Sequence, residues 1–339
     1  SSRYLAVFGF AIYVAAFFRI LRAMVSRPWA LLFVAFLLAY RIWAFPHWQV
    51  YSYSLASAAL ITLAAALATH FWESGSRAGL FLAGLVAGGA ILCKQDYGLG
   101  VTGGLGLAML LLPFLRREGL DPWHTFVLRP AIFGMGALAV LLAGLLMLGM
   151  DGVLVEFYTQ AVLQPLRGAT SFNPYPRLPD IFPFWSQDPV FRSQIGHYFP
   201  AILVTLFWGP ISNGWILRET AIWEIGLKVV FWTPLWSFAV AFVLWMGRSL
   251  GVGGRRHPLA PARFLLLGLA GGFLLAFPPP RDWTHLMMIL PPQVALLTVL
   301  LADMQSRLPR SIRPAVWWTS VSLVGLLMVS SLFLALELR

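Results

Sequence analysis

A connection between two apolar runs, near residues 78–93 and 98–115, holds a lysine and an aspartate two positions apart, Lys94 and Asp96. If both runs cross a membrane, so short a connection keeps these side chains at or just below its surface. Charged groups at that depth are costly and are usually paired or functional. Lys94 could there present its ammonium to the anionic headgroup of a lipid. The alternative is a local Lys94–Asp96 ion pair that only closes a helical hairpin.

A second polar turn combines three ionisable side chains, Arg281, Asp282 and His285, after a run of three prolines. Arg281 can bind a phosphate through two parallel hydrogen bonds, and Asp282 can orient Arg281 or accept a hydrogen bond from a sugar hydroxyl. His285 can donate to a phosphate or relay a proton. The alternative is a polar turn anchored at a membrane interface by Trp283.

The composition of the chain is that of a membrane protein. Of the 339 residues, 59% are hydrophobic and only 11% are charged, and the mean hydropathy is +0.78. A soluble domain is about one quarter charged, so this surface cannot face water over most of its area. Soluble enzymes, coiled coils, disulfide scaffolds and disordered chains are therefore excluded. We predict an all-α fold, a polytopic transmembrane helical bundle with an irregular loop region on its outer face.

Ten apolar runs come near the length that crosses a bilayer. They lie near residues 4–22, 28–45, 52–72, 78–93, 98–115, 130–149, 229–247, 263–279, 285–303 and 314–336. The runs predict three parts of the chain: a first transmembrane helix group at 1–149, an outer-face loop with interfacial or re-entrant helices at 150–228, and a C-terminal transmembrane helix group at 229–339.

Arginines mark alternate loops between these runs, which is the positive-inside pattern. They are Arg19, Arg22, Arg27, Arg77, Arg116, Arg117, Arg129, Arg248, Arg255, Arg256, Arg263, Arg307, Arg310 and Arg313. The pattern assigns these loops to the cytoplasm and places both polar turns on the outer face, where they can share a pocket. It also explains the net charge of +11. Since no basic stripe interleaves with exposed aromatic residues, we expect no nucleic-acid partner.

The outer-face loop at 150–228 mixes aromatic and charged residues, as sugar-binding surfaces do when they stack rings on the apolar faces of sugars. Tyr175, Arg177 and Trp185 are its candidates for contact with a substrate. The alternative is an aromatic belt at the level of the lipid headgroups, with solvated charges. Within this loop the apolar stretch 198–217 is predicted to be re-entrant or interfacial, because one more span would invert the arginine pattern downstream.

Several familiar kinds of site have no counterpart in the sequence. No cluster of histidines and cysteines has the spacing of metal ligands, and no Walker loop, nucleophile elbow or Ser/His/Asp order is present. No row of charges crosses a span, as a proton relay would require. We therefore expect no cofactor and no metal site among these residues, and leave a divalent cation open as an alternative.

The run of small residues at 82–90, which leads into Lys94-Gln95-Asp96-Tyr97-Gly98, resembles an element of the polyprenyl-phosphate-dependent membrane glycosyltransferases. In those enzymes a helix of small residues ends in a Lys–Gly element. They have the GT-C fold and include protein O-mannosyltransferases and lipid A aminoarabinose transferases. The segment 281–285 is similar to their Arg-x-Asp/Glu-x-x-His-type outer element. The opening span at 4–22 is similar to the helix that follows their first outer loop.

The resemblance implies a multi-pass enzyme of the inner membrane with its active site on the outer, periplasmic face. It would transfer a hexosyl or pentosyl group from a polyprenyl-phosphate donor to a glycan, lipid or protein acceptor. Membrane lipid and this lipid-linked sugar would be its partners. The site residues that the resemblance implies are Lys94, Arg281 and His285 for the donor phosphate, Gln95 and Tyr97 for the substrate, and Asp96 and Asp282 as acid/base candidates.

The sequence departs from this family at one important position. The family has an acidic residue, usually Asp, in its first outer loop, which acts as general base or as a metal or acceptor ligand. No outer loop precedes Tyr4, so no residue of this sequence takes that role. Because the arginine pattern starts the chain on the outer face, we expect a further span and loop upstream of it.

Three other classes of function stay open as alternatives. They are a transporter or flippase for lipid-linked sugars, a ligase or polymerase of surface glycans, and a non-catalytic membrane subunit. A transporter should gather polar groups near the midplane of the membrane and show related halves. The charges of this chain gather at one face instead, which favours chemistry at the membrane surface.

Overall fold

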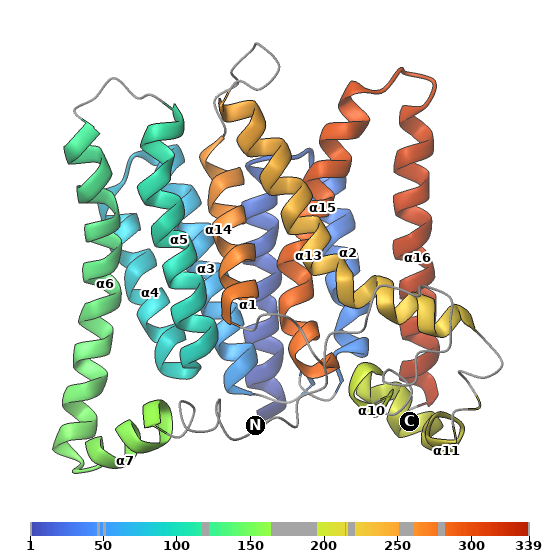
Figure 1. Cartoon of the computed structure of the whole chain (residues 1–339), viewed down its shortest axis with the longest axis horizontal. Coiled ribbons are helices and arrows are strands. Elements are labelled where there is room, and N and C mark those ends of the chain that lie inside the picture. Colours follow the sequence, from blue (N-terminus) through green and yellow to red (C-terminus); the bar gives the residue numbers. More distant parts are fainter. Residues whose placement is uncertain are drawn as a thin grey trace.

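The computed structural model of the chain is an all-α helical bundle, as the sequence predicts (Figure 1). The structure describes residues 2–45, 48–49, 52–116, 122–163, 195–213, 215, 221–250, 260–276 and 282–337. Over these residues the long helices are α1 (Ser2–Arg22), α2 (Arg27–Trp43), α3 (Tyr53–Ser74), α4 (Arg77–Cys93), α5 (Gln95–Arg116), α6 (Pro122–Met150), α13 (Ala221–Leu250), α14 (Pro261–Ala276), α15 (Trp283–Arg307) and α16 (Arg313–Glu337). Each predicted apolar run corresponds to one of these helices.

Within the described residues, seven helices are long and apolar enough to cross a membrane on their own. The corresponding segments are Arg3–Arg22, Tyr53–Phe71, Gln95–Pro113, Val127–Met150, Trp223–Leu250, Trp283–Arg307 and Arg313–Glu337. The helices α2, α4 and α14 have 17, 17 and 16 residues. At 1.5 Å per residue these three are shorter than the roughly 30 Å of a hydrocarbon core. The chain is thus a multi-pass membrane protein.

The helices run up and down, so their connections fall at two opposite ends of the bundle (Figure 1). We call one the arginine end, because Arg22, Arg248 and Arg307 lie in the last turns of α1, α13 and α15 there. We call the other the turn end, because the α4–α5 connection and the start of α15 lie there. The two polar turns of the sequence therefore share one end of the molecule, opposite the arginines.

Small residues hold α5 against α14, the helix that leads toward the second polar turn. A Cβ on Gly100 would come within 2.7 Å of the carbonyl oxygen of Gly272, and one on Gly268 within 2.6 Å of that of Gly104. Such close backbone approach requires glycine and is common where membrane helices pack. This contact fixes the position of the α4–α5 connection relative to α14.

Short helices lie between α6 and α13. They are α7 (Leu154–Tyr158), the π-helical turn η1 (Thr159–Leu163), α10 (Ile195–Tyr198) and α11 (Ala201–Ser212). Helix α11 has 12 residues and a non-helical Phe207 inside it, and 12 residues cover only about 18 Å. It lies at the turn end (Figure 1) and contacts α2. Helix α11 is therefore too short to be another span.

Candidate functional site

A one-residue connection positions Lys94. Helix α4 ends at Cys93, and Lys94 follows in an extended conformation, with its backbone N–H donating to the carbonyl oxygen of Ala90. Helix α5 begins at the next residue, Gln95, which is half-buried. Gly98 allows this tight reversal, because a Cβ there would collide with the backbone of Ile91. The turn therefore holds Lys94 at the very end of the helical pair.

The Lys94 ammonium lies among aromatic and acidic groups. It is 3.9 Å from the centre of the Tyr97 ring and 3.2 Å from Ser54 Oγ, to which it donates a hydrogen bond. The Asp96 carboxylate is 3.6 Å away, and the Lys94 side chain is only 15% exposed. Burial lowers the pKa of Lys94, while the negative charges of Asp96 and Asp282 oppose this shift. The predicted Lys94–Asp96 pair is present, but it is one of several contacts.

Asp96 is the more accessible acid of this turn. Its side chain is 32% exposed, and its Oδ1 accepts a hydrogen bond of 2.7 Å from the backbone N–H of Tyr97. The Tyr97 ring is buried and packs against Phe273 of α14, with ring centroids 5.6 Å apart. Asp96 thus faces the surface while Tyr97 anchors the turn in the core.

The second turn is built around Asp282, which caps α15. One carboxylate oxygen accepts the backbone N–H of His285 at 2.9 Å, and the His285 Nδ1 lies 2.8 Å from both carboxylate oxygens. Burial raises the pKa of Asp282, but the hydrogen bonds and the charges of His285 and His197 outweigh it and hold this pKa below its usual value. Asp282 thereby fixes the orientation of the His285 ring.

The two turns are close enough to act on each other. The charge of Asp282 acts on both Lys94 and Tyr97. Arg281, however, lies outside the described residues, as do Tyr175, Arg177 and Trp185. The predicted pairing of Lys94 with Arg281 at one phosphate, and the predicted substrate contacts of the outer-face loop, stay predictions.

A buried aromatic cluster beside the second turn was not anticipated from the sequence. Tyr40 packs against both Trp48 and Trp283, and Tyr13 packs edge-on against Trp48. The hydroxyls of Tyr13 and Tyr40 are buried, and neither has a hydrogen-bond partner among the described residues. Nothing local distinguishes these residues, since each is one aromatic among many in an apolar run; only the packing of α1 and α2 against α15 brings them together.

An apolar cavity of about 350 Å³ lies next to this aromatic cluster. It is formed by α2, α11, α13, α15 and α16, and its lining residues are Phe36, Tyr40, Trp43, Pro200, Leu203, Trp223, Gly226, Leu227, Val230, Trp283, Leu290 and Leu327. Trp283 directly follows Asp282, and its indole N–H donates to the carbonyl oxygen of Trp43 at 3.0 Å. The cavity could hold a hydrocarbon chain whose polar end meets the turns.

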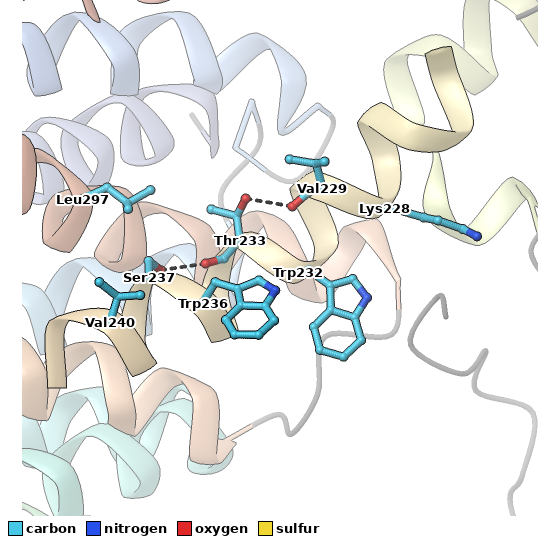
Figure 2. A pocket seen from close by; sticks show the side chains of 8 residues that line it. All are labelled: Lys228, Val229, Trp232, Thr233, Trp236, Ser237, Val240 and Leu297. Atoms are coloured by element: carbon cyan, nitrogen blue, oxygen red, sulfur yellow. Dashed lines mark hydrogen bonds between the residues drawn. The ribbon is translucent and has the colours of Figure 1, made fainter. Parts of the chain in front are cut away.

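A second depression, of about 270 Å³, lies on α13 (Figure 2). Trp232 and Trp236 stand side by side along it, while Lys228 extends away from their rings (Figure 2). The ammonium of Lys228 lies 3.3 Å from the carboxylate of Glu224, and both side chains are almost fully buried. This pair therefore belongs to the interior of the protein.

The described residues contain no group of three or more histidine, cysteine, aspartate or glutamate side chains arranged to hold a metal ion. Comparisons of the chain with protein families, curated proteins and solved structures found no match. The site must therefore be interpreted from its own geometry.

Proposed function

We propose that this protein is a membrane glycosyltransferase that uses a polyprenyl-phosphate sugar as donor. The observation that carries the proposal is that a largely buried cation, Lys94, and the Asp282–His285 pair lie at the same end of the bundle, with the charge of Asp282 acting on Lys94. An apolar cavity lined in part by Trp283, the residue after Asp282, lies next to the second turn. A lipid-linked phosphate needs this combination: positive charge for the phosphate and an apolar slot for the chain.

The proposed chemistry follows from the placement of the charges. The bond between the sugar's anomeric carbon and the phosphate oxygen breaks, and the phosphate leaves on its lipid. The acceptor hydroxyl forms the new bond to that carbon and gives its proton to a base. Lys94 and Arg281 would stabilise the charge that develops on the phosphate. Of the two acids Asp96 is better placed as a base, because Asp282 already binds His285 through both oxygens.

The acceptor would be a glycan, lipid or protein on the outer face of the inner membrane. That orientation rests on the arginine end facing the cytoplasm, by the positive-inside rule. His285 would meet the phosphate through Nε2, since Nδ1 is directed at Asp282. Gln95 and Tyr97 would contact the substrate next to Lys94. No cofactor is needed for this step, because the leaving phosphate can be stabilised by the cationic side chains.

The test uses membranes from cells that express the protein, and undecaprenyl-phosphate sugars with a radiolabelled hexose or pentose. Lys94→Ala and Arg281→Ala are expected to abolish transfer of label to membrane acceptors while leaving membrane insertion unchanged. Arg310→Ala, an exposed arginine at the arginine end, is the matched control. Full transfer by both site variants would refute the proposed donor site.

One observation favours a transporter of lipid-linked sugars as the second candidate. The buried Glu224–Lys228 pair in α13 is the kind of intramembrane charge that transporters use. The two candidates differ in vesicles that contain the purified protein and a fluorescent polyprenyl phosphate. A transporter moves the lipid between leaflets without an acceptor, and a transferase does not.

A further inference from the structure

At the arginine end, arginines of two helices approach one carboxylate of a third helix. Arg263 at the start of α14 forms a two-pronged pair with Asp303 of α15, with N–O distances of 2.7 and 2.6 Å. Arg248 of α13 approaches the same carboxylate at 3.6 Å. The charges of Arg307 and Arg263 both act on Arg248. Two guanidinium groups thus share one carboxylate, and the charge of a third, Arg307, acts on Arg248, which leaves a local charge of +2.

The cluster also contains polar atoms whose hydrogen-bonding capacity is unused. Trp245 is fully buried beneath Arg263, whose guanidinium carbon lies 5.6 Å from the centre of the indole ring. Ser249 follows one turn later on α13 and is 6% exposed. The indole N–H of Trp245 and the hydroxyl of Ser249 have no hydrogen-bond partner among the described residues. A buried donor without a partner costs free energy, so such atoms mark a place for an acceptor.

An apolar groove of about 390 Å³ runs along α5, α13 and α14 toward this cluster. Its main walls are Leu107, Leu111, Phe238, Phe242, Phe264 and Leu267. On α13 the groove residues Phe238 and Phe242 are followed at helical spacing by Trp245 and Ser249, so all four share one face. On α14, Arg263 directly precedes Phe264. The groove therefore reaches the end of the bundle at which the arginine cluster lies, and on α14 it ends at the residue next to Arg263.

We propose that this groove and cluster bind an anionic phospholipid. An acyl chain occupies the groove, and the phosphate lies at Arg248 and Arg307, where the excess positive charge is. Arginine binds phosphate oxygens in pairs, and basic pockets between membrane helices are suited to anionic headgroups. The apolar groove that ends next to the cluster is what selects a lipid over a free anion. This site is at the opposite end of the bundle from the polar turns and does not depend on the proposed function.

The experiment measures lipid that stays bound to the protein purified in detergent. The protein is incubated with dioleoyl phosphatidylglycerol or dioleoyl phosphatidylcholine, and retained lipid is counted by native mass spectrometry. Arg248→Gln should lower retention of phosphatidylglycerol about fivefold, because one arginine near an anionic headgroup contributes about 1 kcal/mol to binding. Arg310→Gln removes an exposed arginine from the same end and should change nothing. Since the Arg263–Asp303 pair is untouched, the Arg248→Gln protein keeps its fold, which thermal unfolding checks.

A second pair of variants separates a lipid from a free anion. Leu107→Trp fills the groove and should lower retention of phosphatidylglycerol. Leu146→Trp is the control, because Leu146 is exposed on α6 outside the groove, and it should leave retention unchanged. Inorganic phosphate is the competing probe. Equal retention of both lipids, or equal effects of the two arginine variants, would overturn the proposal. Binding of phosphate alone, dependent on Arg248 and unaffected by Leu107→Trp, would overturn it in favour of a free-anion site.

Discussion

Replacing Lys94 by methionine should make the folded protein more stable. The Lys94 side chain is only 15% exposed, and burial lowers the pKa of its ammonium despite the opposing charges of Asp96 and Asp282. Compared with water, the site therefore disfavours the charged form of this side chain. Methionine keeps a flexible, unbranched chain and carries no charge. A residue that lowers stability where it stands is typical of a site kept for function.

The contacts that methionine loses set the size of the effect. The ion pair with Asp96 at 3.6 Å contributes about 0.5 kcal/mol. The hydrogen bond to Ser54 and the contact with the Tyr97 ring contribute about 1 kcal/mol each. Burying an ammonium costs several kcal/mol; taken as about 3.5 kcal/mol for this partly exposed side chain, that cost exceeds the roughly 2.5 kcal/mol of lost contacts, and the net gain on removal is about 1 kcal/mol. For a chain of this size that raises Tm by about 2 °C.

The assay is thermal unfolding of the purified protein in detergent, followed by tryptophan fluorescence at pH 7. Asp96→Asn is the matched variant and should lower Tm by about 1 to 2 °C, because the ammonium then loses an opposing charge. The sign of the pH dependence is also fixed. As pH rises toward 10.5, the folded protein releases the Lys94 proton before the unfolded chain does. The wild-type protein therefore becomes more stable as pH rises, and the difference in Tm between it and the Lys94→Met protein becomes smaller. A Lys94→Met protein that is destabilised as much as Asp96→Asn would refute this reasoning and show a purely structural ion pair.

Three further predictions use the same unfolding assay. Asp282→Asn keeps the helix cap but loses the charge paired with His285, and should destabilise the protein by about 1 to 2 kcal/mol at neutral pH. The pKa of Asp282 in the folded protein lies below 3.8. The difference in stability between the variant and wild type should therefore vanish as the pH falls from 3.8 through this lower pKa, where the wild-type carboxylate is protonated. Gly104→Ala should destabilise by about 2 kcal/mol, since its Cβ would collide with the backbone of α14, whereas Gly103→Ala, with nothing within 4 Å, should be neutral or slightly stabilising. Tyr40→Phe removes a buried hydroxyl without a partner and should stabilise by about 1 kcal/mol; a loss of similar size would show that this hydroxyl is bonded in solution.

Apolar length and arginine placement predicted the main features of the bundle. Ten runs corresponded to ten helices over the described residues, because a 20-residue apolar segment in a membrane must satisfy its own backbone hydrogen bonds. The turn at Lys94 was also predictable, since only a few residues separate the runs on either side. What the sequence did not show is which helices pack together. Tyr13 and Tyr40 form one cluster with Trp48, and no local pattern marks them.

The glycines of α5 show which features the local sequence predicts and which depend on how the helices pack. The glycine-rich run after Lys94 is typical of helices that allow close approach of a backbone. In the structure Gly100 and Gly104 meet the backbone of α14, whereas Gly103 and Gly106 have nothing within 4 Å. Spacing four apart selects the first pair as one helix face, but only the partner helix decides which face is used. Through α14 that choice also places the Lys94 turn near Asp282, so the candidate site depends on helix packing as much as on its own residues.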